Sequence, residues 1–135
     1  MKRLLSKVCR RLEADGSLAV IITDFRRIMK LNMEYFGRNR PTDVLAFDLA
    51  ERSRARYLEG EIYVCLPQVR KQAMEEGVPL EEEFARICLH GLLHLLGYDD
   101  KKKRDRDLMW KAQESLLKGS FDGIKFRWRT SREKE

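Results

Sequence analysis

The fold is decided by one stretch of sequence, residues 79–97, which reads PLEEEFARICLHGLLHLLG. Three consecutive glutamates follow its proline, and this favours a helix N-terminus because the helix dipole stabilises anions there. Apolar residues line one side of this helix and surround it almost completely near its end, which is typical of a helix central to the fold. Gly97 is then a residue suited to ending the helix.

Further elements are predicted on both sides of this central helix. Runs rich in β-branched residues predict strands, and apolar residues at helical spacing predict helices. The expected strands are residues 18–23, 44–47 and 60–66, and the expected helices are residues 1–13, 24–35, 67–77 and 104–118. Asp15 and Gly16 are read as a turn and residues 50–56 as a hairpin connection. The chain is therefore predicted to be an α+β domain, a small mixed β-sheet of three to four strands packed with about five helices.

Two of these helices have a predicted inner side. Helix 24–35, capped by Asp24, is expected to turn Phe25, Ile28, Met29 and Leu31 inward. The last helix is expected to turn Leu108, Ala112, Ser115 and Leu116 inward.

Length and composition limit the class of protein. A chain of 135 residues is expected to form one domain. We place this domain at residues 1–120 and read residues 121–135 as a basic tail, either a flexible end or a docked strand. The sequence has no apolar run long enough to span a membrane and no signal-peptide core, so a cytoplasmic location without membrane contact is expected. The three cysteines include no close pair, which favours buried free thiols.

The charge distribution is compatible with a polyanionic partner. The chain holds 28 Lys and Arg against 22 Asp and Glu, a formal net charge of +6. The cations cluster along the chain, whereas the acidic residues concentrate between Glu75 and Glu83. Such a surface is typical of a protein that binds a phosphate backbone, and equally of an ordinary solvated surface.

The chain has only two histidines, and both lie on the central helix. His90 and His94 are one helical turn apart, about 6 Å along the axis, and so project from the same face. This spacing lets two imidazoles reach one tetrahedral metal ion.

A third ligand is expected just beyond Gly97, where the chain can turn back toward the histidines. A helical histidine pair, a glycine turn and a third ligand six residues after the second histidine form the layout of metzincin zinc sites. That position is Asp100, with Asp99 as the neighbouring alternative and a turn or capping role as the other interpretation. The predicted cofactor is one divalent ion, zinc, whose bound water would become a nucleophile near neutral pH.

A zinc protease is one interpretation of this layout. In His-Glu-x-x-His proteases the glutamate next to the first histidine is the general base. Gly91 stands there in this chain and cannot transfer a proton, which argues against peptide hydrolysis.

Three sequence blocks resemble one known family. Residues 90–100, HGLLHLLGYDD, closely resemble the HGxLHLxGYDH signature of the YbeY family. Residues 31–47 resemble its LNxxYRxxxxPTDVLSF block, and GEI at residues 60–62 resembles its GDI strand. The chain departs from these patterns at Phe36, Ala46, Asp48, Glu61 and Asp100, which replace Arg, Ser, Pro, Asp and His.

The resemblance implies a metal-dependent endoribonuclease of ribosomal RNA maturation. It implies an α+β domain, single-stranded RNA as the substrate, and an association with the ribosome, of which the small subunit is the expected partner. His90, His94 and Asp100 are then the expected metal ligands and catalytic residues. Arg38 and Arg40 are the candidates for binding the RNA backbone, since Phe36 replaces the family's arginine.

Two points stay open. Asp43, Glu61 and Asp99 are the candidates for a general base, each with an alternative role in capping or at a strand end. The second interpretation of the whole chain is a catalytically weak factor that binds RNA or the ribosome and carries a structural metal, which the changes at Phe36 and Asp100 favour.

Overall fold

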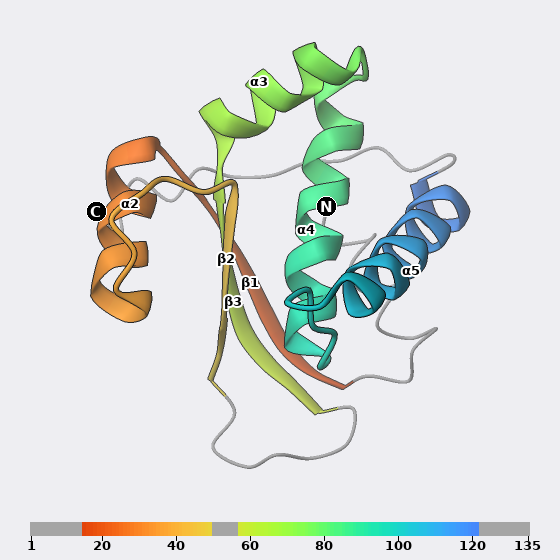
Figure 1. Ribbon diagram of the computed structural model, residues 1–135, viewed down its shortest axis with the longest axis horizontal. Helices are drawn as coiled ribbons and strands as arrows, with labels where there is room; N and C mark the ends of the chain where they lie inside the picture. Colours follow the sequence, from red (N-terminus) through yellow and green to blue (C-terminus); the bar gives the residue numbers. More distant parts are fainter. Residues whose placement is uncertain (1–14, 50–56, 122–135) are drawn as a thin grey trace.

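The structure is a computed structural model, and it describes residues 15–49 and 57–121. A three-stranded sheet is packed with helices on both of its faces (Figure 1). The elements follow in the order β1 (Asp15–Thr23), α2 (Phe25–Phe36), β2 (Val44–Asp48), β3 (Tyr57–Cys65), α3 (Leu66–Glu76), α4 (Leu80–Leu95) and α5 (Lys103–Phe121). The predicted α+β class is confirmed.

The sheet is mixed, with the strand order β1-β3-β2. β1 pairs in parallel with β3, and β2 pairs antiparallel with β3. The expected turn at Asp15 and Gly16 is wrong, because these residues extend β1 and pair with Tyr57 and Leu58. Pairing with β3 gives Asp15 and Gly16 an extended backbone conformation, and this overrides the local turn preference of an Asp-Gly pair.

The two faces of the sheet carry different helices. α4 packs on one face and α2 on the other (Figure 1). Successive side chains of a strand point to opposite faces, so Ile62 and Val64 of β3 enter the core beneath α4, while Tyr63 and Cys65 join the cluster beneath α2. Any β3 residue in phase with Tyr63 therefore points away from α4.

Two glycines let α4 lie close to the sheet. A Cβ atom at Gly91 would come within 3.0 Å of Cγ2 of Ile62 and 3.3 Å of Cγ2 of Val44. A Cβ atom at Gly60 would come within 2.8 Å of Cδ1 of Leu95. Glycine at position 91, one residue after His90, thus allows the histidine-bearing part of α4 to approach Ile62 and Val44 of the sheet closely.

The predicted inner sides of two helices need correction. On α2, Ile28 is fully buried as expected, but Phe25 and Met29 are 39% and 36% exposed and the second buried residue is Asn32. The Asn32 side chain donates a hydrogen bond to the backbone oxygen of Arg40, so a polar contact rather than apolar packing orients this face.

On α5 the prediction is right in part. Leu116 is buried and Ala112 packs against the core as expected, whereas Leu108 is 52% exposed and Ser115 is exposed. The other buried residues are Met109, Gln113 and Leu117. The buried side of α5 thus includes a glutamine, which an apolar pattern does not reveal.

Some expectations fall outside the described residues: the helix 1–13, the hairpin connection 50–56, Cys9 and the tail after Phe121. Cys65 and Cys88 are free and buried, as predicted. Among the helices of residues 15–49 and 57–121, none is long and apolar enough to cross a membrane.

Candidate metal centre

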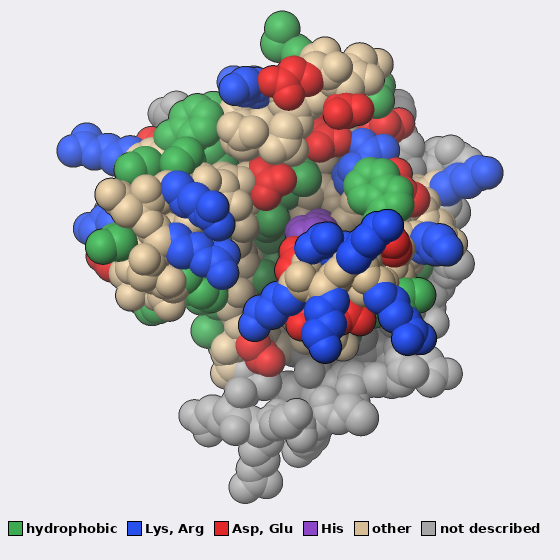
Figure 2. Space-filling view, in the orientation of Figure 1, with side chains coloured by type: hydrophobic (Ala, Val, Ile, Leu, Met, Phe, Trp, Pro, Cys, Tyr) green, Lys and Arg blue, Asp and Glu red, His purple; other side chains and the backbone are tan. Residues whose placement is uncertain are grey.

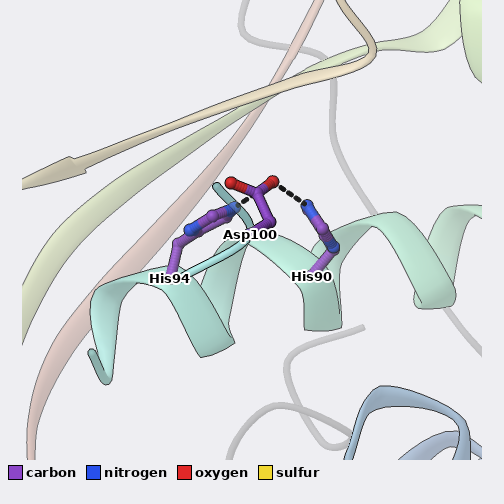
Figure 3. A group of neighbouring side chains, drawn as sticks. All are labelled: His90, His94 and Asp100. Atoms are coloured by element: carbon purple, nitrogen blue, oxygen red, sulfur yellow. Dashed lines mark ion pairs between the residues drawn. The ribbon is translucent and has the colours of Figure 1, made fainter. Parts of the chain in front are cut away.

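Three side chains converge beside the C-terminal half of α4. The rings of His90 and His94 lie edge to face with their centroids 4.8 Å apart. Asp100, in the segment after α4, places Oδ2 3.8 Å from Nε2 of His90 and 3.3 Å from Nε2 of His94 (Figure 3). One ligand atom from each residue lies within 4.8 Å of the others. The arrangement is a candidate site for one metal ion.

A tight turn brings Asp100 back to the helix. Gly97 has a φ of 103°, a left-handed conformation that side-chain-bearing residues rarely adopt. The amide of Tyr98 donates to the oxygen of Leu93, and that of Gly97 donates to the oxygen of His94. The turn predicted at Gly97 is confirmed, and it reverses the chain directly toward the two imidazoles.

Both imidazoles are oriented by hydrogen bonds at Nδ1. Nδ1 of His94 lies 3.2 Å from the backbone oxygen of Tyr98, and Nδ1 of His90 lies 2.9 Å from Oε1 of Gln113. A carbonyl oxygen only accepts, so these contacts favour a proton on each Nδ1, and a neutral ring then has its lone pair on Nε2. Both Nε2 atoms face Asp100, so one atom from each of the three residues is directed to the place where a divalent cation could bind.

Sequence reasoning did not find Gln113. This residue lies on α5 and is only 3% exposed. A glutamine placed on the buried stripe of an amphipathic helix is the sequence feature that could have revealed it, because buried amides need partners. Its contact with His90 depends on the packing of α5 against α4, which the sequence pattern does not give.

The candidate general bases are not part of the metal group. Asp43 accepts hydrogen bonds from Thr42 and Gln72, and Glu61 accepts one from Tyr63. Glu61 is in phase with Tyr63 on β3 and so lies on the sheet face opposite α4. Asp99 is exposed and accepts from the amide of Lys101, which is the turn role considered for it.

The centre lies in a hollow bordered by cations. Figure 2 shows histidine at the floor of this hollow, with Lys and Arg side chains over the loop before α5 on one side and over the α2 side on the other. Arg38 and Arg40 are exposed in the segment between α2 and β2. On the α5 side the exposed cations are Lys101, Lys102, Lys103, Arg104 and Arg106.

The fold and these three side chains define an α+β protein with a candidate metal centre on its central helix. A sequence profile of the family described as "Endoribonuclease YbeY" matches residues 1–120. The chain belongs to this family, which confirms the resemblance seen in its motifs and the predicted class of enzyme, an endoribonuclease.

Individual relatives agree with this assignment. An "Endoribonuclease YbeY" of Persephonella marina is 34% identical over 121 residues, covering 87% of this chain and 79% of the relative. That of Desulforamulus reducens is 38% identical over 109 residues, covering 76% and 71%. A Thermotoga maritima protein with a known solution structure superposes with a TM-score of 0.66 at 32% identity, covering 89% of this chain and 78% of that one.

Proposed function

We propose that this chain is a single-strand-specific, metal-dependent endoribonuclease that acts in ribosomal RNA processing and ribosome maturation. Its substrate is RNA in the cytoplasm, and the small ribosomal subunit is its proposed partner. The observation that carries the proposal is the convergence of His90, His94 and Asp100 in a chain of the endoribonuclease YbeY family.

His90, His94 and Asp100 are the proposed catalytic residues and metal ligands, and the proposed ion is zinc. Two imidazoles and one carboxylate are a competent zinc set that leaves one position open. When bound there, zinc supplies a Lewis acid and an activated water at neutral pH. Gln113 and the Tyr98 carbonyl contact the Nδ1 atoms of the two rings, which leaves both Nε2 atoms for the ion.

Arg38 and Arg40 are the proposed contacts to the RNA backbone. Both are exposed in the segment between α2 and β2, and their guanidinium groups can bind phosphate through paired hydrogen bonds. Phosphate contacts hold a strand in register without reading its sequence. The exposed cations Lys101, Lys102, Lys103, Arg104 and Arg106, close in sequence to Asp100, are further candidates for phosphate contacts.

The test is cleavage of matched single-stranded and double-stranded RNA by the purified full chain. We expect cleavage of the single strand alone, loss of cleavage with a chelator, recovery on adding zinc, and no activity in His94→Ala. Asp99→Ala is the matched control and should cleave normally. Cleavage that persists undiminished in excess chelator would overturn the metal-dependent mechanism.

The second candidate function is an RNA- or ribosome-binding factor with a structural metal. Phe36 and Asp100 favour it, because they replace the arginine and the third histidine of the family motif. Such a factor would bind single-stranded RNA and lose stability on chelation, yet leave the RNA intact with zinc, manganese or magnesium.

A further inference from the structure

A continuous series of side-chain hydrogen bonds connects His90 to residues far from the metal group. It passes through α5, α4 and α3 and reaches the segment before β2. The members are His90, Gln113, Glu114, Arg86, Glu83, Gln72 and Asp43. Glu83 and Gln113 are only 5% and 3% exposed, so much of the series lies inside the protein.

Charge fixes the direction of each hydrogen bond in this series. Arg86 only donates, and it reaches Glu114 at 3.0 Å and 3.2 Å through Nε and Nη2. The Glu114 carboxylate only accepts, and its Oε2 lies 3.2 Å from Nε2 of Gln113. The Gln113 amide must therefore turn its NH2 group to Glu114 and its oxygen to His90.

The same logic extends to the imidazole. The Gln113 oxygen lies 2.9 Å from Nδ1 of His90 and can only accept, so Nδ1 must donate. The proton of the neutral ring is thereby placed on Nδ1, and Nε2 keeps its lone pair toward His94 and Asp100. Reversal of the amide would present an NH2 group to Nδ1 and move the proton to Nε2, where it would block a metal ion.

Arg86 anchors this arrangement between two helices. Burial alone would lower the pKa of its guanidinium, but hydrogen bonds to Glu114 and Glu83 raise it above its usual value. Its side chain is 16% exposed and lies 2.6 Å from Glu83 of its own helix. The cation therefore stays charged and holds Glu114 of α5 in a fixed place relative to α4.

The two histidines are controlled differently. Nδ1 of His94 faces the backbone oxygen of Tyr98, which is part of the Gly97 turn and cannot rotate. Nδ1 of His90 faces a side-chain amide, which can rotate unless another group fixes it. At Nδ1, therefore, the contact of His90 depends on the orientation of a side chain, whereas that of His94 does not.

We propose that Gln113 is a positioning residue that holds His90 in its metal-binding tautomer, and that Arg86 and Glu114 set the orientation of its amide. This inference rests on the proposed metal role of His90. The helix α5 carries none of the three metal ligands, yet through Gln113 it would control the ligand His90.

The test is the tautomer of each histidine in the metal-free full chain carrying Asp100→Ala, which removes the carboxylate that lies beside both Nε2 atoms and would accept a proton from them. The tautomers are observed by long-range proton–nitrogen NMR at a pH where both rings are neutral. The chain has only two histidines, so each ring gives a resolved pattern and His94 is an internal control. We expect the Nδ1–H form for both rings in this variant, into which the further substitutions are introduced. In Gln113→Leu, His90 should become a mixture of tautomers while His94 is unchanged.

Zinc affinity, measured by competition with a chromophoric chelator, is the second readout. Gln113→Leu should bind zinc about 10- to 100-fold more weakly, the usual effect of losing such an outer partner. Gln113→Glu keeps an acceptor opposite Nδ1 and should keep the tautomer. Glu114→Gln should give mixed tautomers of His90 and a smaller loss of zinc affinity than Gln113→Leu. It also keeps the proposal testable if Gln113→Leu does not fold.

Glu81→Gln is the matched control, because it removes an exposed carboxylate from α4 outside the series. It should change neither readout. If His90 keeps the Nδ1–H form and zinc affinity stays within about twofold in Gln113→Leu and Glu114→Gln, the proposal is wrong. Absence of RNA cleavage by the unmodified chain would overturn the proposed function and leave the tautomer result standing.

Discussion

A Cβ atom at position 91 would lie 3.0 Å from Cγ2 of Ile62, closer than nearly all real contacts of such atoms. Gly91 thus allows close packing where α4 meets the sheet, besides lacking the carboxylate of a general base. The position that holds the general base in zinc proteases is here part of the packed core.

Gly91→Ala should lower the free energy of unfolding by about 1 kcal/mol. Alanine gains about 1 kcal/mol of helix propensity, but overpacking against Ile62 and Val44 costs about 1–3 kcal/mol. Gly91→Glu should cost more than about 3 kcal/mol, because it also buries a carboxylate. Denaturant unfolding measures both, and Ile62→Ala in the same chain should relieve part of the Gly91→Ala cost. Stabilisation by Gly91→Ala alone would contradict the close packing.

Asp100→Ala should lower zinc affinity more than about 100-fold, beyond the 10- to 100-fold loss typical of an outer partner. Its Oδ2 lies 3.3 Å from Nε2 of His94, and among the described residues Asp100 is the carboxylate that groups with the two histidines. Asp100→His should retain zinc, because it restores the third histidine of the family motif. Metal content after dialysis is the measurement.

Asp99→Ala is the control for that experiment. Asp99 accepts from the Lys101 amide in the turn and should leave the metal content unchanged. Equal metal content in Asp100→Ala and the unmodified chain would remove Asp100 from the site.

Arg38→Gln and Arg40→Gln should each weaken binding of single-stranded RNA and reduce its salt dependence. Each lost phosphate contact lowers the slope of log affinity against log salt by about 0.7. Binding is measured by fluorescence anisotropy at several salt concentrations with the metal ion present. Arg70→Gln on α3 is a control at another exposed arginine. Slopes that match the unmodified chain would show that neither arginine contacts phosphate.

The thiols of Cys65 and Cys88 should be unreactive in the folded protein. Burial raises the pKa of the Cys88 thiol, and burial likewise raises that of Cys65, partly offset by a backbone hydrogen bond at Gln68. In a Cys9→Ser variant, alkylation near pH 8 should proceed only after denaturation. Rapid labelling of the native variant would contradict this burial.

The same thiols predict a pH dependence of stability. In the unfolded chain they ionise near pH 8.5, whereas in the folded chain they keep their protons to higher pH. The unfolded state therefore binds fewer protons above about pH 8.5, and stability falls as pH rises, by up to about 1.4 kcal/mol per unit for each thiol. A Cys65→Ala, Cys88→Ala double variant should show a shallower fall.

The parts of the fold that depend on local sequence could be predicted. The helix of residues 79–97, its histidine pair and the turn at Gly97 depend on neighbours in the chain. They lie where the sequence places them. Asp100 follows this turn closely, so its convergence with the histidines could also be predicted.

The parts of the fold that depend on packing between distant elements could not be predicted from the sequence. The buried stripe of α5 includes Gln113, whose partner His90 lies on another helix. The extension of β1 through Asp15 comes from pairing with Tyr57, and the need for Gly91 comes from Ile62 on β3. Each depends on a contact that no periodicity within one segment encodes.

All three ligands of the candidate centre lie in one short stretch, from His90 to Asp100, although the partner that orients His90 comes from α5. An unfolded chain keeps this stretch intact and so keeps part of its affinity for the ion. Stabilisation of the native state by an ion depends on the ratio of its affinities for the folded and unfolded chains, so the ion should stabilise this protein less than its affinity alone suggests. Thermodynamic coupling between metal loading and global folding then arises from the helical geometry of α4, the turn at Gly97 and the contact that α5 adds to the site.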